Sequence, residues 1–587
     1  MFKMFKTFTK KDWVIVLFSF ILITSQVWLD LKLPDYMSSI TTLIQTEGSN
    51  IRDILLQGGY MMLCAFGSLI SAILVGFLTS KLSANFSLNL RSKIFRKVGK
   101  FGMEEIKKFE TSSLITRTTN DVTQIEMFIA MGLQMLIKAP VMAIWAVTKI
   151  LNKNLEWSIL TGACVVILLI TVITLLIIVF PRFEKVQKLI DKVNGVTREN
   201  LTGIRVIRAF NAEKYQQNRF ESVNRNLTNM QMFNQKCFAI LNPMMNLVMH
   251  SLTLGIYIIG AILISNAGLL DKISLFSNMV VFTSYGMQVI AAFLMLAMIF
   301  MILPRAQVSA KRINEVLDSD ISIKDGKIDV KETKEVGTVE FKNVSFKYPD
   351  SGEYLLENIS FKVEKGETIA FIGSTGSGKS TLINLVPRFY DATDGEVLID
   401  GINVKDYTLE SLNNKIGYVP QKAVMFTGTV KSNVGYGYNG RKEASLNKIK
   451  EAIEVAQGTD FVTSMDKNYN AHIARGGTNI SGGQKQRLAI ARAIARDPEI
   501  YIFDDSFSAL DYKTDSILRK NLKKYTKDAT SLIVAQRIGT IINADKIVVL
   551  DKGKCVGIGT HKELLKKCKV YKEIALSQLS KEELQNG

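Results

Sequence analysis

The clearest chemistry in the chain lies in a glycine-rich run at residues 371–381, which reads FIGSTGSGKST. The run fits G-x-x-x-x-G-K-[ST], the pattern of a loop whose backbone N–H groups surround phosphate oxygens. An apolar run at 368–372 predicts a buried strand before the loop, and residues 382–385 predict a helix after it. We expect Lys379 to reach the β- and γ-phosphates of a nucleotide and Ser380 to hold Mg²⁺. The residues expected to surround the phosphates are Gly373, Ser374, Thr375, Gly376, Ser377, Gly378, Lys379, Ser380 and Thr381.

A pair of carboxylates extends this candidate site. Residues 499–503 (EIYIF) predict a hydrophobic strand, and Asp504 and Asp505 follow directly at its end. An acidic residue at the end of a buried strand lies where Mg²⁺ would be held opposite Ser380. The pair therefore favours a nucleotide site over a plain glycine-rich turn.

A second helix start lies between these two stretches. A Ser-Gly-Gly-Gln sequence precedes the helical run at 488–495, and free N–H groups at a helix start suit a phosphate. The alternative is an ordinary helix cap, but the presence of both halves of a phosphate-loop site favours a phosphate contact. The residues concerned are Ser481, Gly482, Gly483 and Gln484.

Six apolar runs dominate the first half of the 587-residue chain, in which 47% of all residues are hydrophobic. A membrane-spanning helix needs about 20 apolar residues, so each run predicts one span. The first run is short enough for a signal peptide. No small-residue cleavage site follows it and five further runs do, so we interpret it as a retained helix. The runs are 13–29, 54–80, 127–148, 157–181, 237–270 and 273–304.

The net charge of +19 is distributed as in a membrane protein, and we expect no nucleic-acid partner. Residues 81–123 carry nine Lys/Arg and residues 182–236 carry eleven, whereas residues 30–53 carry two against four acidic residues. Positively charged loops stay in the cytoplasm. We therefore expect a multi-pass protein of the plasma membrane with its N-terminus and its C-terminal half in the cytoplasm.

The coarse pattern predicts how the chain is divided. Apolar and charged residues alternate at helical spacing in 84–110 and 182–236, so the membrane helices should continue into the cytoplasm. Polar stretches rich in Thr, Asn and Gly at 111–121 and 200–211 predict breaks in those helices. From residue 338 onward, short β-rich runs alternate with helical ones, which is typical of an α/β domain.

The predicted fold is a polytopic α-helical membrane domain followed by an α/β domain with a phosphate loop. The predicted boundaries are 1–310 for the membrane domain, 311–337 for a linker, 338–577 for the nucleotide-binding domain and 578–587 for a polar tail.

Taken together, these motifs resemble an ABC exporter half-transporter, in which a six-span membrane domain is fused to one ABC ATPase domain. The resemblance covers essentially the whole chain. By this resemblance Ser481–Gln484 is the signature motif, with Ile480 where leucine is usual, and the breaks at 111–121 and 200–211 are coupling segments. The resemblance implies that the domain binds ATP with Mg²⁺.

The same resemblance assigns three further positions. Tyr348 matches the aromatic residue that stacks on adenine. Gln421 matches the glutamine that contacts Mg²⁺ and the membrane domain, and Asp511 matches the aspartate of the D-loop.

Two catalytic positions depart from the family pattern. The family has a catalytic glutamate where this chain has Asp505, and a switch histidine where it has Gln536. The loop at 473–476 also lacks a glutamate that is usual before the signature. Neither His250 nor His561 lies where it could replace the switch histidine. The resemblance is therefore closest to the subunit of a heterodimeric multidrug exporter that carries a degenerate site.

In this family two ATPase domains enclose two ATP molecules, each between one domain's phosphate loop and the other's signature. We therefore expect a second half-transporter as partner, whose competent site this chain's signature completes. The expected substrates are hydrophobic or amphipathic drug-like compounds. The alternatives are a dedicated lipid or peptide exporter and a regulatory ATPase subunit that does not transport.

Three features of the membrane runs leave their roles open. Lys138 interrupts an apolar run, and it either faces a water-filled cavity or snorkels. His250 can be a neutral, hydrogen-bonded residue. A cluster of methionines suits either an adaptable binding surface or helix packing, and packing is favoured. Its members are Met244, Met245, Met249, Met279, Met287, Met295, Met298 and Met301.

Overall fold

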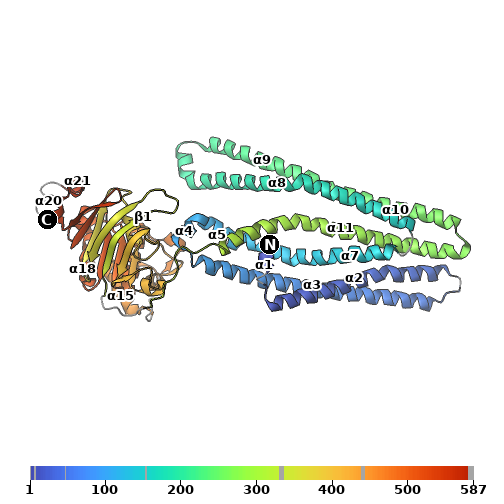
Figure 1. The fold of residues 1–587 in the computed structure, drawn as a ribbon. Helices are drawn as coiled ribbons and strands as arrows, with labels where there is room; N and C mark the ends of the chain where they lie inside the picture. The colour runs from blue at the N-terminus through green and yellow to red at the C-terminus, as the bar shows by residue number, and fades with distance from the viewer. Residues whose placement is uncertain are drawn as a thin grey trace. The chain divides into compact units, whose positions relative to one another are not determined.

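The computed structural model describes residues 2–5, 8–46, 48–151, 155–329, 336–437 and 443–579. The chain divides into two compact units. The helical unit comprises residues 1–99 and 111–319, and the α/β unit comprises residues 100–110 and 320–587. The first consists of long helices, while the second contains all the strands (Figure 1).

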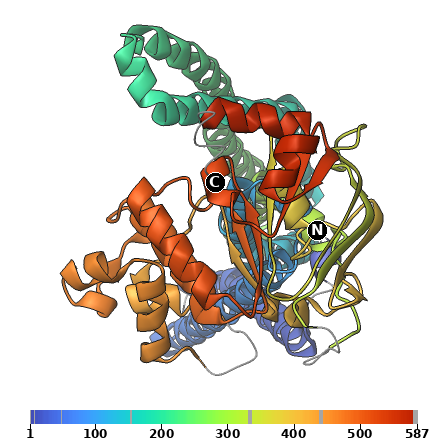
Figure 2. The ribbon, with the colours of Figure 1, turned by 90° about the vertical axis from the view of Figure 1, so that its left-hand side faces the viewer.

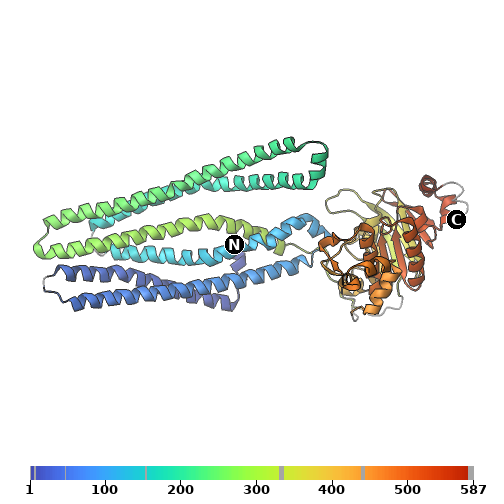
Figure 3. The same cartoon turned by 180° about the vertical axis from the view of Figure 1, so that it is seen from behind.

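Six segments of the helical unit are long and apolar enough to cross a membrane, which confirms the six predicted spans. These segments are Lys10–Gln45, Ile51–Val98, Thr111–Ile150, Leu155–Val179, Glu213–Asn266 and Asp271–Leu317. The helices of the unit are α1 (Phe2–Phe5), α2 (Lys10–Gln45), α3 (Ile51–Val98), α5 (Thr111–Thr118), α6 (Asn120–Met127), a π-helical turn (Phe128–Gly132), α7 (Leu133–Leu151), α8 (Leu155–Ala209), α9 (Glu213–Ala239), α10 (Leu241–Asn266) and α11 (Leu269–Leu317). Figure 3 shows α2 and α3 side by side as a hairpin.

The helical unit has a packed interior and an apolar exterior. Ile23, Trp157 and Phe282 are fully buried in one cluster with residues of α7, α8, α10 and α11. By contrast, Leu17 and Ile170 are about 60% exposed, and many other large apolar side chains face outward. Contiguous apolar surface of this kind is rare on a protein surrounded by water, but suits helices that face lipid.

The two predicted helix breaks are each found only in part. Within 111–121 only Thr119 is non-helical, as a turn between two helices, and a longer interruption lies earlier, between Gly99 and Glu110. The second break is confined to residues 210–212, at the end of the predicted stretch, because α8 continues to Ala209. Most of the first stretch is helical because threonine hydroxyls donate to the carbonyl of the preceding turn, as Thr118 does to Leu114 at 2.8 Å. Such bonds keep the hydroxyls inside a helix rather than ending it.

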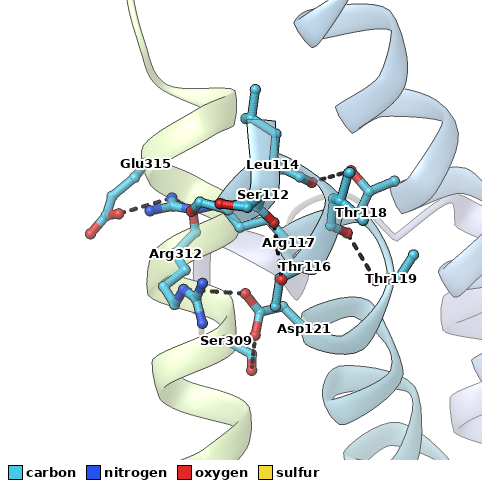
Figure 4. A network of polar contacts seen from close by, with 12 residues as sticks. Ser112, Leu114, Thr116, Arg117, Thr118, Thr119, Asp121, Ser309, Arg312 and Glu315 are labelled. Carbon is cyan, nitrogen blue, oxygen red and sulfur yellow. Dashed lines mark hydrogen bonds and ion pairs between the residues drawn. The ribbon is translucent and has the colours of Figure 1, made fainter. Parts of the chain in front are cut away.

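A polar network fixes this region to α11 (Figure 4). Arg117 donates to the carbonyl of Arg312 and pairs with Glu315 at 2.9 Å. Asp121 pairs with Arg312 at 3.4 Å and accepts a hydrogen bond from Ser309 at 3.0 Å. The stretch predicted as a polar break is therefore mostly helical and is held to the cytoplasmic end of α11.

The α/β unit contains a six-stranded sheet and a four-stranded sheet. The first has the order β12-β11-β3-β10-β9-β6, parallel except for β12, and the second has the antiparallel order β2-β1-β4-β5. In Figure 2 the yellow-green strands of the second sheet lie to one side of the first sheet, and orange helices lie to the other. The strands are β1 (Val339–Phe346), β2 (Leu356–Val363), β3 (Thr368–Gly373), β4 (Asp394–Ile399), β5 (Ile402–Asn403), β6 (Ile416–Val419), β7 (Gly428–Thr429), β8 (His472–Ile473), β9 (Ile500–Asp504), β10 (Thr530–Val534), β11 (Lys546–Asp551) and β12 (Lys554–Gly559).

Helices cover the six-stranded sheet and build its core. The helices of the unit are α4 (Met103–Phe109), α12 (Lys379–Asn384), α13 (Leu409–Asn414), α14 (Val430–Val434), α15 (Leu446–Val455), α16 (Thr459–Ser464), α17 (Gly482–Arg496), α18 (Tyr512–Tyr525), α19 (Ile538–Ile541), α20 (His561–Lys567) and α21 (Lys569–Gln578). Strand β3 lies between β10 and β11, and its residues Ala370 and Phe371 are fully buried. A strand buried on both faces needs a continuous apolar run, which is what the sequence provides there.

Two segments of the sequence, residues 100–110 and the residues from 320 onward, fold together in the α/β unit. In α4, Glu105 is only 4% exposed, and its carboxylate accepts hydrogen bonds from the N–H of Gly102 at 2.7 Å and of Ser322 at 2.9 Å. In the segment predicted as a linker, α11 continues to Leu317, and Ile328 forms a β-bridge with Tyr407.

Candidate functional site

The glycine-rich loop joins β3 to α12 and has the backbone of a phosphate cradle. Gly376 and Gly378 have φ angles of 83° and 93°, in the left-handed region that favours glycine. A Cβ at Gly378 would lie 2.5 Å from the Cδ2 of Leu356, whereas nothing lies within 4 Å of a Cβ at Gly376. The loop therefore fits closely against its own domain at Gly378 and leaves open space at Gly376, which suits a bound phosphate chain.

Lys379 opens α12 and points back at this loop. Its Nζ donates to the carbonyl oxygens of Gly373 at 2.9 Å and Ser374 at 2.8 Å. Burial lowers the pKa of this ammonium, and the carboxylates of Asp505 and Asp504 act in the opposite direction. A cation partly removed from water beside two acids and the loop is suited to a phosphate oxygen.

Ser380 and Asp504, two of the residues predicted at a Mg²⁺ site, lie next to each other. The hydroxyl of Ser380 donates to Oδ1 of Asp504 at 2.8 Å, and Asp504 is only 5% exposed at the end of β9. Burial raises the pKa of Asp504, and the charge of Asp505 adds to this effect. A hydroxyl and a carboxylate are hard oxygen ligands of the kind Mg²⁺ takes together with phosphate oxygens and water, so the residues present fit the ion.

Asp505 is held between two glutamine side chains. The Nε2 of Gln536 donates to Oδ2 of Asp505 at 2.8 Å, and the Nε2 of Gln421 donates to the same oxygen at 3.2 Å. Gln421, predicted as a Mg²⁺ ligand, thus contacts Asp505 in this structure. Strands β9 and β10 are parallel neighbours with Asp504 opposite Val534, which explains how residues 31 positions apart meet at one sheet edge. Burial raises the pKa of Asp505.

Tyr348 lies at the other end of the site. Its hydroxyl is 3.0 Å from that of Thr381 at the end of the phosphate loop, and Tyr390 packs edge-on against its ring at 5.4 Å between centroids. The ammonium of Lys107 in α4 lies 5.5 Å from the Tyr348 ring centroid. Tyr390 and Lys107 were not predicted from the sequence, since neither lies in a recognisable motif.

The Ser-Gly-Gly-Gln sequence forms a capping box at the start of α17. The N–H of Gln484 bonds to the hydroxyl of Ser481 at 3.3 Å, and the N–H of Ser481 bonds back to the Gln484 amide at 2.9 Å. Ser481 and Gly482 are exposed, and nothing lies within 4 Å of a Cβ at Gly482. The helix cap, which was the alternative to a phosphate contact, is therefore present, and the helix start beside it is open.

Asp511 has a structural contact of its own. It is the N-cap of α18, and its carboxylate accepts the N–H of Thr514 at 2.9 Å. This backbone hydrogen bond lowers the pKa of Asp511. Gln486, which was not predicted, donates to the carbonyl of Pro420 at 3.2 Å and so steadies the residue before Gln421.

The fold and the site together define a membrane protein with six spans and a fused nucleotide-binding domain of the phosphate-loop class. Comparison with known families agrees: residues 16–316 match the family described as ABC transporter transmembrane region, and residues 356–508 match the family described as ABC transporter. The chain belongs to the ABC transporter family and is an ATP-driven exporter half-transporter.

Relatives cover most of the chain. An uncharacterized ABC transporter ATP-binding protein of Mycobacterium bovis is 38% identical over 89% of this chain and 87% of its own length. A Bacillus subtilis protein of the same description is 34% identical over 91% of each chain. A Staphylococcus aureus protein whose name assigns it to multidrug export is 33% identical over 83% of each.

A solved structure matches the whole fold. The structure of a bacterial Atm1-family ABC exporter with ATP bound has a TM-score of 0.81 to this chain, covering 96% of this chain and 99% of the other at 24% identity. This likeness concerns the fold. The chain is accordingly a multi-pass membrane protein whose ATPase domain lies in the cytoplasm.

Proposed function

We propose that this chain is one subunit of a heterodimeric exporter and that its own nucleotide site hydrolyses ATP slowly. The observation that carries the proposal is the pair of amide donors on Asp505, from Gln536 at 2.8 Å and Gln421 at 3.2 Å. Hydrolysis needs a carboxylate to position or deprotonate the attacking water, and a group that stabilises charge at the γ-phosphate.

Both requirements are poorly met at this site. The carboxylate of an aspartate lies one methylene closer to the backbone than that of a glutamate, and a misplacement of about 1 Å can cost on the order of 10²-fold in rate. Gln536 donates a hydrogen bond but has no proton to transfer. In the position described, that donor already serves Asp505.

Binding of Mg-ATP depends on different residues. The loop N–H groups and Lys379 bind and orient the phosphates, Tyr348 offers its ring to the adenine, and Ser380 with Asp504 holds the ion. Mg²⁺ supplies charge neutralisation between the phosphate oxygens. The site should therefore retain nucleotide although its hydrolytic side chains are altered.

The signature serves the partner's site. Ser481 and Gly482 are exposed, and the side chain of Ser481 bonds to the N–H of Gln484 within the capping box. Free N–H groups at the start of a 15-residue helix can donate to the phosphate held by a second ATPase domain. An intact signature beside an altered hydrolytic pair supports a division of labour between two unlike subunits.

The expected substrates are hydrophobic or amphipathic compounds. A cavity of about 320 Å³ lies between α8, α10 and α11, and its lining includes Leu168, Met245 and Phe293 and no charged residue. Its apolar lining suits an uncharged part of a ligand. The name of the S. aureus relative supports multidrug export. A lipid or peptide exporter and a regulatory subunit are the alternative functions.

The experiment compares the purified chain alone with the chain joined to a second half-transporter that carries Glu and His at these two positions. We expect ATP hydrolysis to be slow for the chain alone and fast for the pair. Substrate movement into inside-out vesicles should require the pair. Fast hydrolysis by the chain alone would refute the degenerate site, and hydrolysis without substrate movement would favour the regulatory alternative.

A further inference from the structure

A lysine and an aspartate face each other inside the membrane spans. Lys138 of α7 lies 3.6 Å from the Oδ2 of Asp30 in α2, and the side chain of Lys138 is 16% exposed. The outer end of α7 is Leu151, about 20 Å further along the helix at 1.5 Å per residue. A snorkelling lysine cannot cover that distance, so its charge stays in the membrane interior.

This ion pair is looser than a second one nearby. Lys149 donates to Asp35 at 2.7 Å, and the other oxygen of Asp35 accepts from Tyr285 at 2.6 Å. At 3.6 Å Lys138 is beyond hydrogen-bonding distance from Asp30, and its ammonium donates to no described residue. An ammonium has three donors, so Lys138 has the capacity to bind an acceptor that this chain does not provide.

Two buried acceptors beside the loose pair are also unfilled. Gln26 precedes Asp30 by one helical turn and is 6% exposed, and its Oε1 has no hydrogen-bond partner among the described residues. Gln288 of α11 donates to the carbonyl of Asp30 at 3.4 Å, and its Oε1 is likewise buried without a described partner. Buried polar atoms without partners cost free energy, and ionisable residues inside a membrane usually mark a functional site.

We propose that Lys138, Asp30, Gln26 and Gln288 bind the headgroup of an amphiphile in which an anion is joined to an ammonium, as in phosphoethanolamine. This inference rests on the proposed function and narrows its substrate class. A purely anionic ligand would be repelled by Asp30 and a purely cationic one by Lys138. A zwitterion presents its anion to Lys138 and its N–H donors to the glutamine oxygens and to Oδ2 of Asp30, while Oδ1 of Asp30 already accepts a hydrogen bond from Ser68. The charges at the site therefore stay balanced.

The test measures equilibrium binding of a phosphatidylethanolamine labelled on an acyl chain to the full chain in nanodiscs, without nucleotide. Lys138→Met and Asp30→Asn should each weaken binding at least about tenfold, because each removes a charge-assisted contact. The matched controls Lys149→Met and Asp35→Asn alter the tight pair and should change binding less than about twofold. Lys138→Arg keeps the charge and should retain most of the binding, which separates a lost contact from a lost fold.

Lipid probes with the same acyl chains test whether the headgroup or the acyl chains determine the affinity. Phosphatidylglycerol, which is only anionic, and diacylglycerol, which is uncharged, should bind more weakly than phosphatidylethanolamine. Asp30→Asn should strengthen the binding of phosphatidylglycerol, because it removes the repulsion, and should leave the binding of diacylglycerol unchanged. Equal binding of the three probes, unchanged binding in the two variants, or equal losses in the controls would overturn the proposal. If free phosphoethanolamine displaces the labelled lipid, the site recognises a soluble ligand. If the lipid binds and free phosphoethanolamine does not displace it, the site recognises the lipid itself. Because this experiment measures no hydrolysis, a negative binding result does not bear on the degenerate-site proposal. Likewise, fast hydrolysis by the chain alone does not bear on headgroup binding.

Discussion

The phosphate-loop side and the signature side of the ATPase domain differ in how completely this chain builds them. On the loop side, Ser380 donates to Asp504 and Gln536 donates to Asp505 within one chain, and both aspartates are buried. On the signature side, Gly482 is exposed and faces open space. The contacts of the loop side are therefore made by this chain itself, whereas the signature side has a function only if another molecule covers it.

The largest effect should come from the signature side. Gly482→Asp introduces a carboxylate where nothing obstructs it, so the fold should be retained, but the new charge would repel the phosphate held by the partner. We expect ATPase turnover of the pair to fall at least about 100-fold, as when a donor to developing charge is lost. Gly352→Asp, at an exposed glycine that also has nothing within 4 Å, is the matched control. Persistent turnover would mean that Gly482 does not face a phosphate.

An intermediate effect should come from the loop side. Lys379→Ala removes the ammonium beside the loop carbonyls and should lower nucleotide occupancy at this chain's site about tenfold, measured by photo-crosslinking. Transport by the pair should slow several-fold without stopping, whereas the equivalent lysine change in the partner should abolish it. The exposed Lys365→Ala serves as control. Equal losses from the two lysine changes would show that both sites hydrolyse.

The smallest effect should come from restoring the hydrolytic pair. Asp505→Glu with Gln536→His rebuilds both family side chains at the end of β9 and β10. We expect at most a few-fold gain in turnover, because the other half of this site is the partner's signature. If the doubly changed chain became an efficient ATPase by itself, the partner would not be limiting and the two sides would be less different than proposed.

The sequence predicted local elements well where one pattern decided the outcome. The strand at 368–372, the loop and the following helix are present, and so are the six spans. The predicted helix breaks were too long, in the first because a threonine hydroxyl can donate to a backbone carbonyl within a helix, as that of Thr118 does to Leu114. The pairing of Asp30 with Lys138 could not be predicted, since it depends on which membrane helices are neighbours.

The hydrolytic pair, Asp505 and Gln536, was only partly predictable from the sequence. Asp505 and Gln536 were singled out by comparison with the family pattern, but their mutual hydrogen bond follows from the parallel pairing of β9 and β10. The contact of Lys107 with Tyr348 had no signal in the sequence, because the residues are joined only by the way α4 folds with the ATPase domain.

That placement of α4 has a consequence for biosynthesis. Residues 100–110 leave the ribosome before the four later membrane spans, yet they complete their contacts only when residues from 320 onward are made. At about 5–20 residues per second, the roughly 200 intervening residues take on the order of 10–40 s to translate. Through that interval the carboxylate of Glu105, buried against Ser322 in the finished protein, has only its local hydrogen bond from the N–H of Gly102. Assembly of the cytoplasmic domain must therefore wait until the four later spans have been translated. In the meantime the nascent chain carries the segment 100–110 without the residues against which it packs.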